Sequence, residues 1–296
     1  MRFSSAIRII PVLILASFAF TANAGGAERA RFLGSFPWKM DQAWFGGWSG
    51  IELSADGQHM TAITDRGYIL AATITRKSDQ ITAVTPSQAW RLKASTGRYL
   101  TPKISDSEGL AIAPNGVIYI SFEGVTRVSL YSRPTKPAQV FRHHKAHRGF
   151  PKNKSLEALA IDHRGRLFAF PEHLVNGTDI RVFVLDNGRW SSPFLLEGGD
   201  GFLPVGADFG PDGRLYLLER SLGVLGFRTR VRRWDLGSGQ PHNEQLLVQT
   251  LSGTHDNLEG LAVWRDKQGR TRLTMIADNN FRWFQRTELV EYAFQE

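Results

Sequence analysis

One short phrase recurs five times along the chain: an apolar strand, a tight polar turn with glycine, and a second strand that ends at a carboxylate. Successive copies begin 59, 49, 48 and 54 residues apart. That spacing is typical of four-stranded propeller blades rather than of helical solenoids. The copies are SGIELSADG (49–57), EGLAIAPNG (108–116), EALAIDHRG (157–165), VGADFGPDG (205–213) and EGLAVWRDKQG (259–269).

The repeat predicts an all-β fold, a β-propeller with five blades. Further β-rich runs after each phrase supply the outer strands, but the fifth copy has one strand too few before the chain ends. We expect residues 29–36 to provide the missing strand and close the ring, which would also protect exposed strand edges. Six blades are possible, because the first interval is long and residues 38–48 could carry a strand.

Acidic residues fall at matching places in three of the hairpins. Residues equidistant from a turn face each other, which would place Glu108 opposite Glu123, Glu157 opposite Glu172 and Glu259 opposite Asp278. Like charges so opposed are destabilising, and they call for a cation, an arginine or a proton held at a raised pKa. The alternative is that these are solvated hairpin ends with registers misplaced by a residue or two.

A ring of carboxylates around a propeller axis suits calcium, which accepts six to eight oxygen ligands in irregular geometry. We predict a calcium site formed by four residues, with neighbours such as Asp106 nearby. Zinc is disfavoured because the chain has no cysteine and its histidines lack the spacing of a closed zinc site. The predicted metal ligands are Glu108, Glu157, Glu259 and Asp278.

The first 24 residues have the pattern of a secretory signal peptide. Arg2 and Arg8 precede an apolar run over residues 9–20, and small residues at 22–24 provide a cleavage site. We therefore expect a single mature propeller domain over 25–296, exported to the periplasm or secreted, without stable membrane insertion and monomeric. The absence of cysteine means that such a protein would rely on core packing rather than disulfides.

The mature chain would be basic. Removing two signal-peptide arginines from the 36 basic residues leaves 34 against 28 acidic residues, a net charge of about +6. This balance favours an anionic small-molecule ligand. Nucleic acid is not an expected partner, because the basic residues are dispersed and no nucleic-acid-binding module is recognisable.

The ordered phrases resemble the phytase-like (esterase-like) family of secreted bacterial propellers. They cover nearly the whole mature chain: TDRG (64–67), DSEGLA (106–111), KSLEALA (154–160), LLER (217–220), DNLEGLA (256–262) and ADNNF (277–281). The resemblance implies hydrolysis of phosphate or carboxylic esters. EGLA also occurs in gluconolactonase and paraoxonase propellers, and the related lactonases use a central calcium to polarise the ester carbonyl.

The first hypothesis is a periplasmic, metal-assisted ester hydrolase, either a phosphoesterase or a lactonase-like esterase. Arg66 and Arg220 would bind the anionic substrate, and Asp65 or Glu172 would act as the base. The alternative is a non-catalytic binding or scaffold propeller in which each arginine pairs with a neighbouring rim acid. Fold alone does not decide between them.

Overall fold

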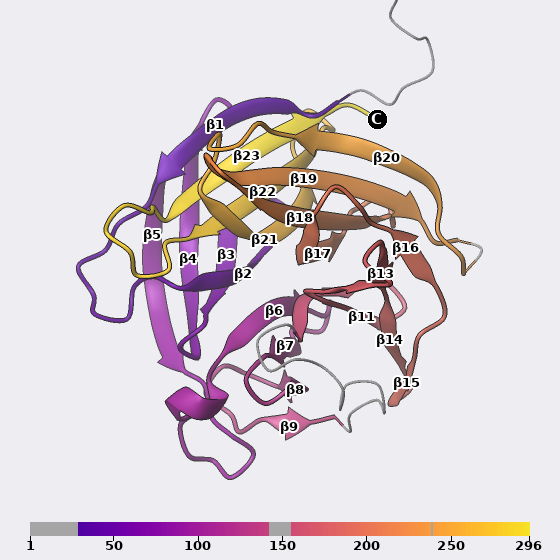
Figure 1. Cartoon of the computed structure of the whole chain (residues 1–296). Helices are drawn as coiled ribbons and strands as arrows, with labels where there is room; N and C mark the ends of the chain where they lie inside the picture. The colour runs from indigo at the N-terminus through magenta and orange to yellow at the C-terminus, as the bar shows by residue number, and fades with distance from the viewer. Residues whose placement is uncertain (1–28, 142–154, 238) are drawn as a thin grey trace, which may run out of the picture.

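The computed structural model describes residues 29–141, 155–237 and 239–296. In these ranges the regular elements are strands, apart from one short 3-10 helix, Pro102–Ile104. The strands form sheets arranged around a central axis (Figure 1). Within the same ranges, no helix is long and apolar enough to cross a membrane. The predicted signal peptide, 1–24, lies outside the described residues.

Four of the sheets each take four strands from consecutive or nearly consecutive stretches of the chain. Their bounds, in chain order, are β2 (Trp48–Leu53), β3 (His59–Thr64), β4 (Tyr68–Lys77) and β5 (Gln80–Arg91); β6 (Ser107–Ile112), β7 (Ile118–Phe122), β8 (Arg127–Tyr131) and β9 (Gln139–Val140); β10 (Leu156–Ile161), β11 (Leu167–Pro171), β14 (Phe183–Asp186) and β15 (Arg189–Ser191); β17 (Leu203–Phe209), β18 (Leu215–Gly223), β19 (Gly226–Asp235) and β20 (His242–Gln249).

A fifth four-stranded sheet joins the two ends of the described chain. It contains β21 (Asn257–Arg265), β22 (Thr271–Asp278) and β23 (Glu288–Phe294), and its fourth strand is β1 (Arg31–Pro37). β1 runs antiparallel to β23, with Phe36 paired to Leu289. The N-terminal segment is therefore the outer strand of the last sheet, and its importance for keeping the ring closed stays a prediction.

The prediction of five blades is wrong by the sheet count, because the described residues form six sheets. The additional sheet has three strands, β12 (Leu174–Val175), β13 (Asp179–Arg181) and β16 (Leu195–Glu197). It arises in the third repeat rather than from residues 38–48. The ladder between β11 and β14 ends at the pair Ala169–Phe183, and Pro171, two residues further along β11, has no backbone N–H to continue it, so the third repeat divides into two sheets.

The innermost strands β2, β6, β10, β17 and β21 neighbour one another around the axis. In all five strands the register shifts at the same point of the repeat, which is the second or third residue of the strand. Such a β-bulge leaves an extra residue unpaired and re-aims its side chain. Glu157 and Glu259 are the extra residues of β10 and β21.

The bulges overturn the predicted hairpin partners. Asp278 pairs with Asn257 rather than with Glu259. In the other two hairpins the N–H of Glu123 donates to the carbonyl of Asp106, and the N–H of Glu172 to that of Ser155. Each predicted partner is two residues off. One residue comes from the turn, where the real register already differs by one from the assumed midpoint, and the other comes from the bulge residue, which the equal-distance rule counts as paired.

Glycine beside the bulge allows neighbouring inner strands to approach backbone to backbone. A Cβ atom at Gly109 would lie 2.6 Å from the carbonyl oxygen of Glu157, and one at Gly206 would lie 2.5 Å from that of Glu259. Real Cβ atoms do not come so close to backbone. The Glu-Gly pair of the repeated phrase thus combines a channel-facing side chain with a residue that fits the tight strand contact.

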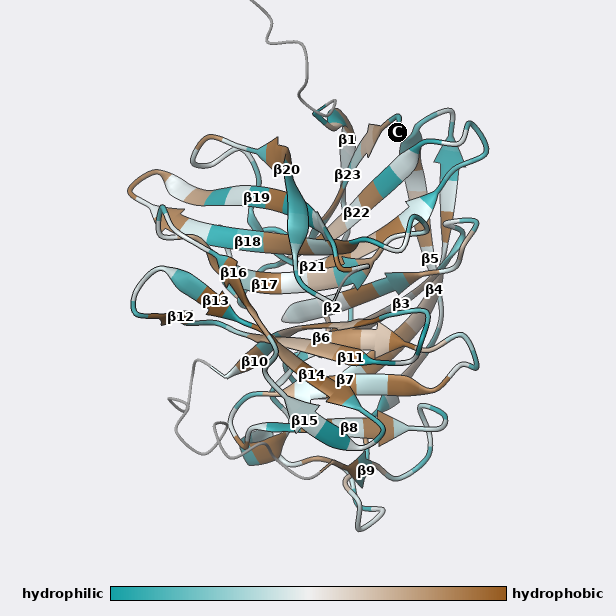
Figure 2. Ribbon diagram, turned by 90° about the vertical axis from the view of Figure 1, so that its right-hand side faces the viewer, coloured by the Kyte–Doolittle hydropathy of each residue, from teal (hydrophilic) through white to brown (hydrophobic). Residues whose placement is uncertain are grey.

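The core lies between adjacent sheets rather than within any one of them. Leu218 and Val231 of the fourth sheet pack with Leu261 and Leu273 of the last sheet, all fully buried. Figure 2 shows apolar residues concentrated along the strands, with hydrophilic residues at the turns. This packing presents the same end of every inner strand at one rim of the propeller.

Candidate functional site

One rim of the central channel is lined with carboxylates. The bulge positions supply Glu108, Glu157 and Glu259, while Ser49 and Val205 occupy the equivalent places in the other two inner strands. A second group comes from the ends of the second strands and from the residue before β6. Its members are Asp65, Asp106, Glu123, Glu172 and Asp278.

The rim carboxylates lie close enough to disturb one another's ionisation. Burial, and then the charges of Glu259 and Asp106, raise the pKa of Glu108 well above its usual range. Burial, and then Glu108 and Glu172, have the same effect on the pKa of Glu157. Removing a proton from Glu108 or Glu157 costs energy because both side chains are desolvated and lie among other carboxylates.

Two aspartates titrate near neutrality for the same reasons. Burial raises the pKa of Asp65 to about 7, with Asp106 and Glu259 adding to the rise and Arg66 opposing it. Burial and the charge of Glu259 raise the pKa of Asp278 to about 8. Groups with such pKa values can take up or release a proton at physiological pH.

Three of these acids form a tight group. Carboxylate oxygens of Asp106, Glu108 and Glu123 all lie within 4.8 Å of one another, and each residue is half-buried. Glu157 adjoins the group through a hydrogen bond that lowers the pKa of Glu123 against the effect of burial. Of the four predicted metal ligands, only Glu108 belongs to this group, so the predicted set stays a prediction.

Arg220 holds a different part of the rim together. Its guanidinium donates to Glu172 at 2.7 Å and also contacts Glu259 and the side-chain oxygen of Asn257. Asn257 in turn donates to Glu259 at 2.7 Å. Burial raises the pKa of Glu259, while Arg220 and Asn257 lower it. One ion-pair cluster therefore brings together Arg220, the predicted substrate ligand, Glu172, the predicted base, and Glu259, a predicted metal ligand.

Arg66 lies beside Asp65 but is engaged differently. Its guanidinium stacks on the ring of Phe281, 3.2 Å from the ring centroid. Among the described residues it forms no salt bridge within 4.0 Å, and its side chain is exposed. One oxygen of Asp65, Oδ1, is buried without a hydrogen-bond partner. Unlike Arg220, Arg66 thus retains donors for a ligand.

Glu219, in the middle of β18, does not face the channel. Both of its oxygens are bound by Arg230 and Arg232 at 2.7–2.9 Å, and all three side chains are buried within the sheet. Successive residues of a strand point to opposite faces. Arg220 is therefore directed to the rim and Glu219 away from it, leaving the fourth repeat without a rim glutamate.

Two further carboxylates lie deeper along the inner strands. Glu52 accepts a hydrogen bond from the N–H of Ile112 at 3.2 Å, and Asp208 accepts one from Val263 at 2.6 Å. Burial raises the pKa of Asp208 to about 7, and burial with the charge of Asp208 raises that of Glu52. Sequence reasoning did not assign them. Comparison of the repeats could have identified them, because three copies have alanine at this position and the other two have the carboxylates Glu52 and Asp208.

A pocket of about 380 Å³ opens beside the Arg220 cluster. Glu172, Arg220 and Glu259 form its charged wall, and Leu203, Leu222 and Phe227 form an apolar wall. Arg282 also lines it. The pocket can therefore receive a small molecule that carries both a polar group and an apolar group.

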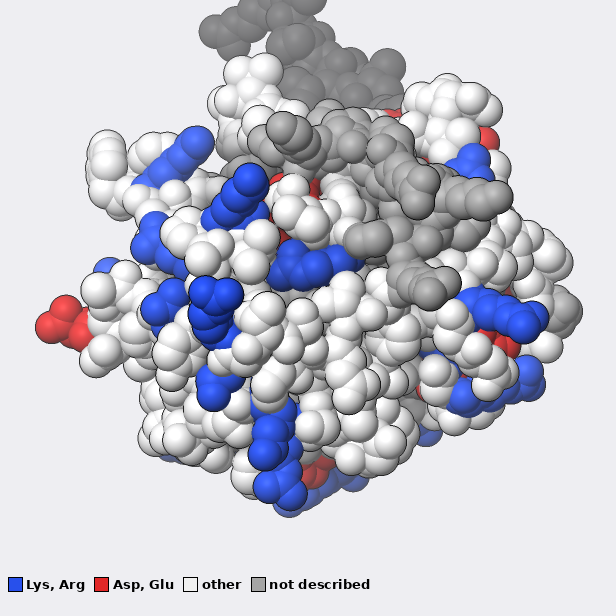
Figure 3. Space-filling view, turned by 90° about the horizontal axis from the view of Figure 1, so that it is seen from below, with Lys and Arg blue, Asp and Glu red and all other residues white. Residues whose placement is uncertain are grey.

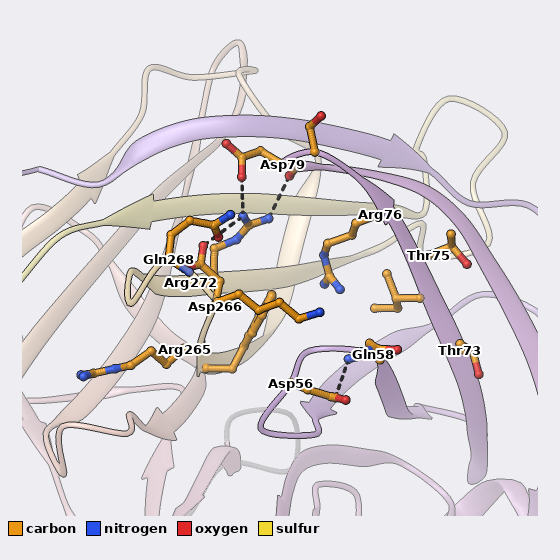
Figure 4. Close-up of a pocket in the computed structure, with 14 residues that line it drawn as sticks. Asp56, Gln58, Thr73, Thr75, Arg76, Asp79, Arg265, Asp266, Gln268 and Arg272 are labelled. Atoms are coloured by element: carbon orange, nitrogen blue, oxygen red, sulfur yellow. Dashed lines mark hydrogen bonds and ion pairs between the residues drawn. The ribbon is translucent and has the colours of Figure 1, made fainter.

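A second pocket, of about 350 Å³, lies at the other end of the strands, between the first and last sheets (Figure 4). Its charged groups are largely paired with one another. Glu291 of β23 binds Arg76 of β4 at 2.7 Å and Arg272 of β22 at 2.6 Å, and Arg270 binds Asp79. We interpret this network as a link between the two ends of the ring rather than as a catalytic centre.

Basic side chains are spread over the surface. Figure 3 shows Lys and Arg scattered among neutral residues over the described part of the face seen from below, with few acidic groups between them. They do not gather there into one continuous stripe. This distribution matches the dispersed pattern seen in the sequence.

The ring of sheets around a central channel defines the chain as a β-propeller, and its acidic residues gather at one rim of that channel. The family model described as "Phytase-like: Esterase-like activity of phytase" matches residues 43–281, and the chain belongs to that family. The suspected family is thereby confirmed. No curated protein matches the sequence significantly.

The chain is similar to several solved structures at low sequence identity. An α-L-arabinofuranosidase from Podospora anserina is 13% identical with a TM-score of 0.53, over 91% of this chain and 98% of that chain. A PQQ-bound aldose sugar dehydrogenase from Streptomyces coelicolor is 12% identical, with a TM-score of 0.48 over 90% and 100%.

Kuenenia stuttgartiensis hydrazine synthase is 14% identical, with a TM-score of 0.45 over 83% of this chain. This chain spans 60% of the length of that one. Of these three matches, the arabinofuranosidase has a TM-score above 0.5 and indicates a shared fold, and at 13% identity it carries no information about a shared substrate.

Proposed function

We propose that this propeller hydrolyses phosphate or carboxylic esters at its acid-lined rim, with calcium bound by the rim carboxylates. Family membership supports a hydrolase of this type. The observation that carries the proposal is the close group of Asp106, Glu108 and Glu123, whose oxygens lie within 4.8 Å of one another. Carboxylates that close repel one another when ionised, and a bound cation removes that penalty.

The donor set fits a hard cation. Every candidate ligand is a carboxylate oxygen, which calcium prefers. Asp106, Glu108 and Glu123 would hold the ion, with Glu157, Glu259 and Asp278 around them. A bound calcium would supply polarisation of the ester oxygen.

Within this proposal Asp65 acts as the general base. Its pKa of about 7 lets its carboxylate accept a proton from water near neutral pH. The water oxygen then bonds to the phosphorus or the carbonyl carbon, and the bond to the leaving alcohol oxygen breaks. The proton on Asp65 can pass to that alcohol, which returns the residue to its starting state.

Arg66 is the stronger candidate for binding an anionic substrate. It is exposed and stacked on Phe281, so its planar guanidinium is already oriented. Arg220 already serves Glu172, Glu259 and Asn257. We therefore assign Arg220 to positioning Glu172 and Glu259, and we favour Asp65 over Glu172 as the base.

A second candidate function is non-catalytic binding. The observation that favours it is the Arg220 cluster, in which one guanidinium is occupied by three acceptors, as expected of a structural ion-pair network. In that case the rim pocket would bind a small molecule without converting it. Many propellers bind without catalysis.

The test begins with calorimetric titration of calcium into chelator-treated protein. Glu108→Gln preserves side-chain size but removes one charge from the group, so calcium affinity should fall by at least about tenfold. Glu157→Gln should lower it less, because Glu157 adjoins the group without belonging to it. Asp186→Asn, which removes an exposed charge at the turn between β14 and β15, at the opposite end of the strands, is the matched control and should bind like wild type.

Turnover of p-nitrophenyl phosphate and p-nitrophenyl butyrate is then measured with and without chelator. The hydrolase proposal expects turnover of one ester that chelator abolishes and that Asp65→Asn lowers without changing calcium affinity more than a few-fold. Calcium binding without turnover would favour the binding protein. Unchanged calcium affinity in Glu108→Gln would contradict the metal site itself.

A further inference from the structure

Three neighbouring loops at the carboxylate rim expose large apolar side chains. The first is the turn between β18 and β19, the second precedes β21, and the third connects β22 to β23. We call their exposed residues the apolar tips: Leu222, Val224, Leu225, Leu251, Trp283 and Phe284.

Contacts between the loops place the tips side by side. The N–H of Gly253 donates to the carbonyl of Phe227 at 2.9 Å, which joins the first and second loops. The N–H of Arg286 donates to Asp256 at 2.8 Å, which joins the second and third. Figure 2 shows the β18–β19 turn projecting beyond the body of the sheets. The tips therefore form one surface.

Their exposure is nearly complete. Relative exposure is 95% for Trp283, 83% for Leu251 and 80% for Leu225, and Val224 is fully exposed. Exposed apolar residues are ordinary when scattered singly, but several on adjoining loops indicate an interaction surface. Because these side chains protrude, they are better suited to insertion into a lipid layer than to packing against a rigid protein surface.

Arginines accompany the tips. Arg282 and Arg286 are exposed on the same loop as Trp283, and Arg66 lies against Phe281 in the same segment. Aromatic and aliphatic side chains beside basic ones are the combination by which peripheral proteins engage an anionic lipid surface. Arg286 is partly neutralised, because its guanidinium lies 3.9 Å from Asp256 and 3.7 Å from Glu288. Its side chain is still exposed, and no salt bridge of Arg282 is found among the described residues.

We propose that the apolar tips dock this protein on an anionic phospholipid surface, with Arg66, Arg282 and Arg286 contacting the headgroups. Leu222 and Arg282 also line the rim pocket, so docking would bring the pocket to the headgroup layer. The proposal does not require hydrolysis. It requires only that the tips insert and that the arginines meet negative charge.

The experiment is co-sedimentation with sucrose-loaded vesicles, either pure phosphatidylcholine or an equal mixture of phosphatidylcholine and phosphatidylglycerol. Wild type should pellet with the mixed vesicles and much less with the neutral ones, and binding should weaken as salt is added. The double variant Trp283→Ser/Phe284→Ser should lower partitioning by about tenfold or more, because apolar insertion is lost. Arg282→Gln should reduce binding only to the anionic vesicles.

Leu195→Ser is the matched control, since it removes an exposed apolar side chain of β16 outside the apolar tips, and it should bind like wild type. Thermal melting checks that each variant is folded, and Leu225→Ser replaces the double variant if that one is not. Failure of wild type to bind mixed vesicles would overturn the proposal, as would equal binding by wild type and the tip variants. Self-association in sedimentation velocity that the tip variants abolish would assign the tips to a second copy instead.

Discussion

At the residue scale, the acidic side chains divide into those facing the channel and those neutralised within the sheets. Glu108 and Glu157 face other carboxylates and their pKa values lie well above the usual range. For Glu291, burial raises the pKa, but Arg76 and Arg272 outweigh it and leave the pKa below the usual range. The difference is the sign of the neighbouring charge, which residue type alone does not reveal.

Glu219→Gln should be strongly destabilising. The substitution leaves the buried guanidiniums of Arg230 and Arg232 without their shared carboxylate, and breaking a buried ion pair by removing one partner costs about 3–5 kcal/mol. The measurement is the free energy of unfolding from urea titration. Glu244→Gln, which removes the more exposed partner of Arg232, is the comparison and should cost no more than about 1 kcal/mol. Equal losses would contradict the account.

At the element scale, the inner-strand bulge determines the site. It recurs in all five inner strands, and it directs Glu108, Glu157 and Glu259 toward the axis. The following small residue lets adjacent strands approach, so the channel is narrow enough for carboxylates from different sheets to interact. One repeated irregularity thus positions side chains from widely separated parts of the chain.

Gly109→Ala should lower thermal stability through this contact. The new Cβ would meet the carbonyl oxygen of Glu157 at 2.6 Å, and backbone must shift to relieve it, at a cost of about 1–3 kcal/mol. Gly237→Ala is the control, because nothing lies within 4 Å of its Cβ position. Calorimetric melting compares the two, and a Gly109→Ala protein that melts with the control would mean that the inner strands are not so tightly packed.

At the scale of the whole molecule, the two ends of the described chain meet in the last sheet. β1 pairs with β23, and ion pairs from Arg76 and Asp79 of the first sheet reach the last one. In a propeller each sheet packs only on its neighbours. At the junction between the first and last sheets the only chain connection is segment 38–47, which links β1 of the last sheet to β2 of the first, so closure there depends on the pairing of β1 with β23.

Removing β1 should therefore lower the melting temperature markedly. A protein beginning at residue 38 would leave β23 as an unprotected edge and expose apolar side chains of the last sheet. A protein beginning at residue 29 is the control, since it retains the whole strand. If the two shortened proteins melt together, β1 does not contribute to closure of the ring.

Sequence alone sufficed for the fold class, the family and the acid-rich character of the rim. These follow from local patterns, because each copy of the repeat carries its own strands, turn glycine and glutamate. The additional sheet in the third repeat was not predictable, since it depends on where the ladder between β11 and β14 ends, at the pair Ala169–Phe183.

Only the tertiary structure decided which acids meet which partners. The hydrophobic pattern marks neither the bulge residue nor the exact centre of the turn, so the predicted partner of Asp278 was Glu259 while the actual one is Asn257. Arg220 reaches Glu172 and Glu259 from a different sheet from either of them. A residue's type and spacing are local properties, whereas the charge and burial that set its pKa come from sheets far apart in the sequence that close around one axis.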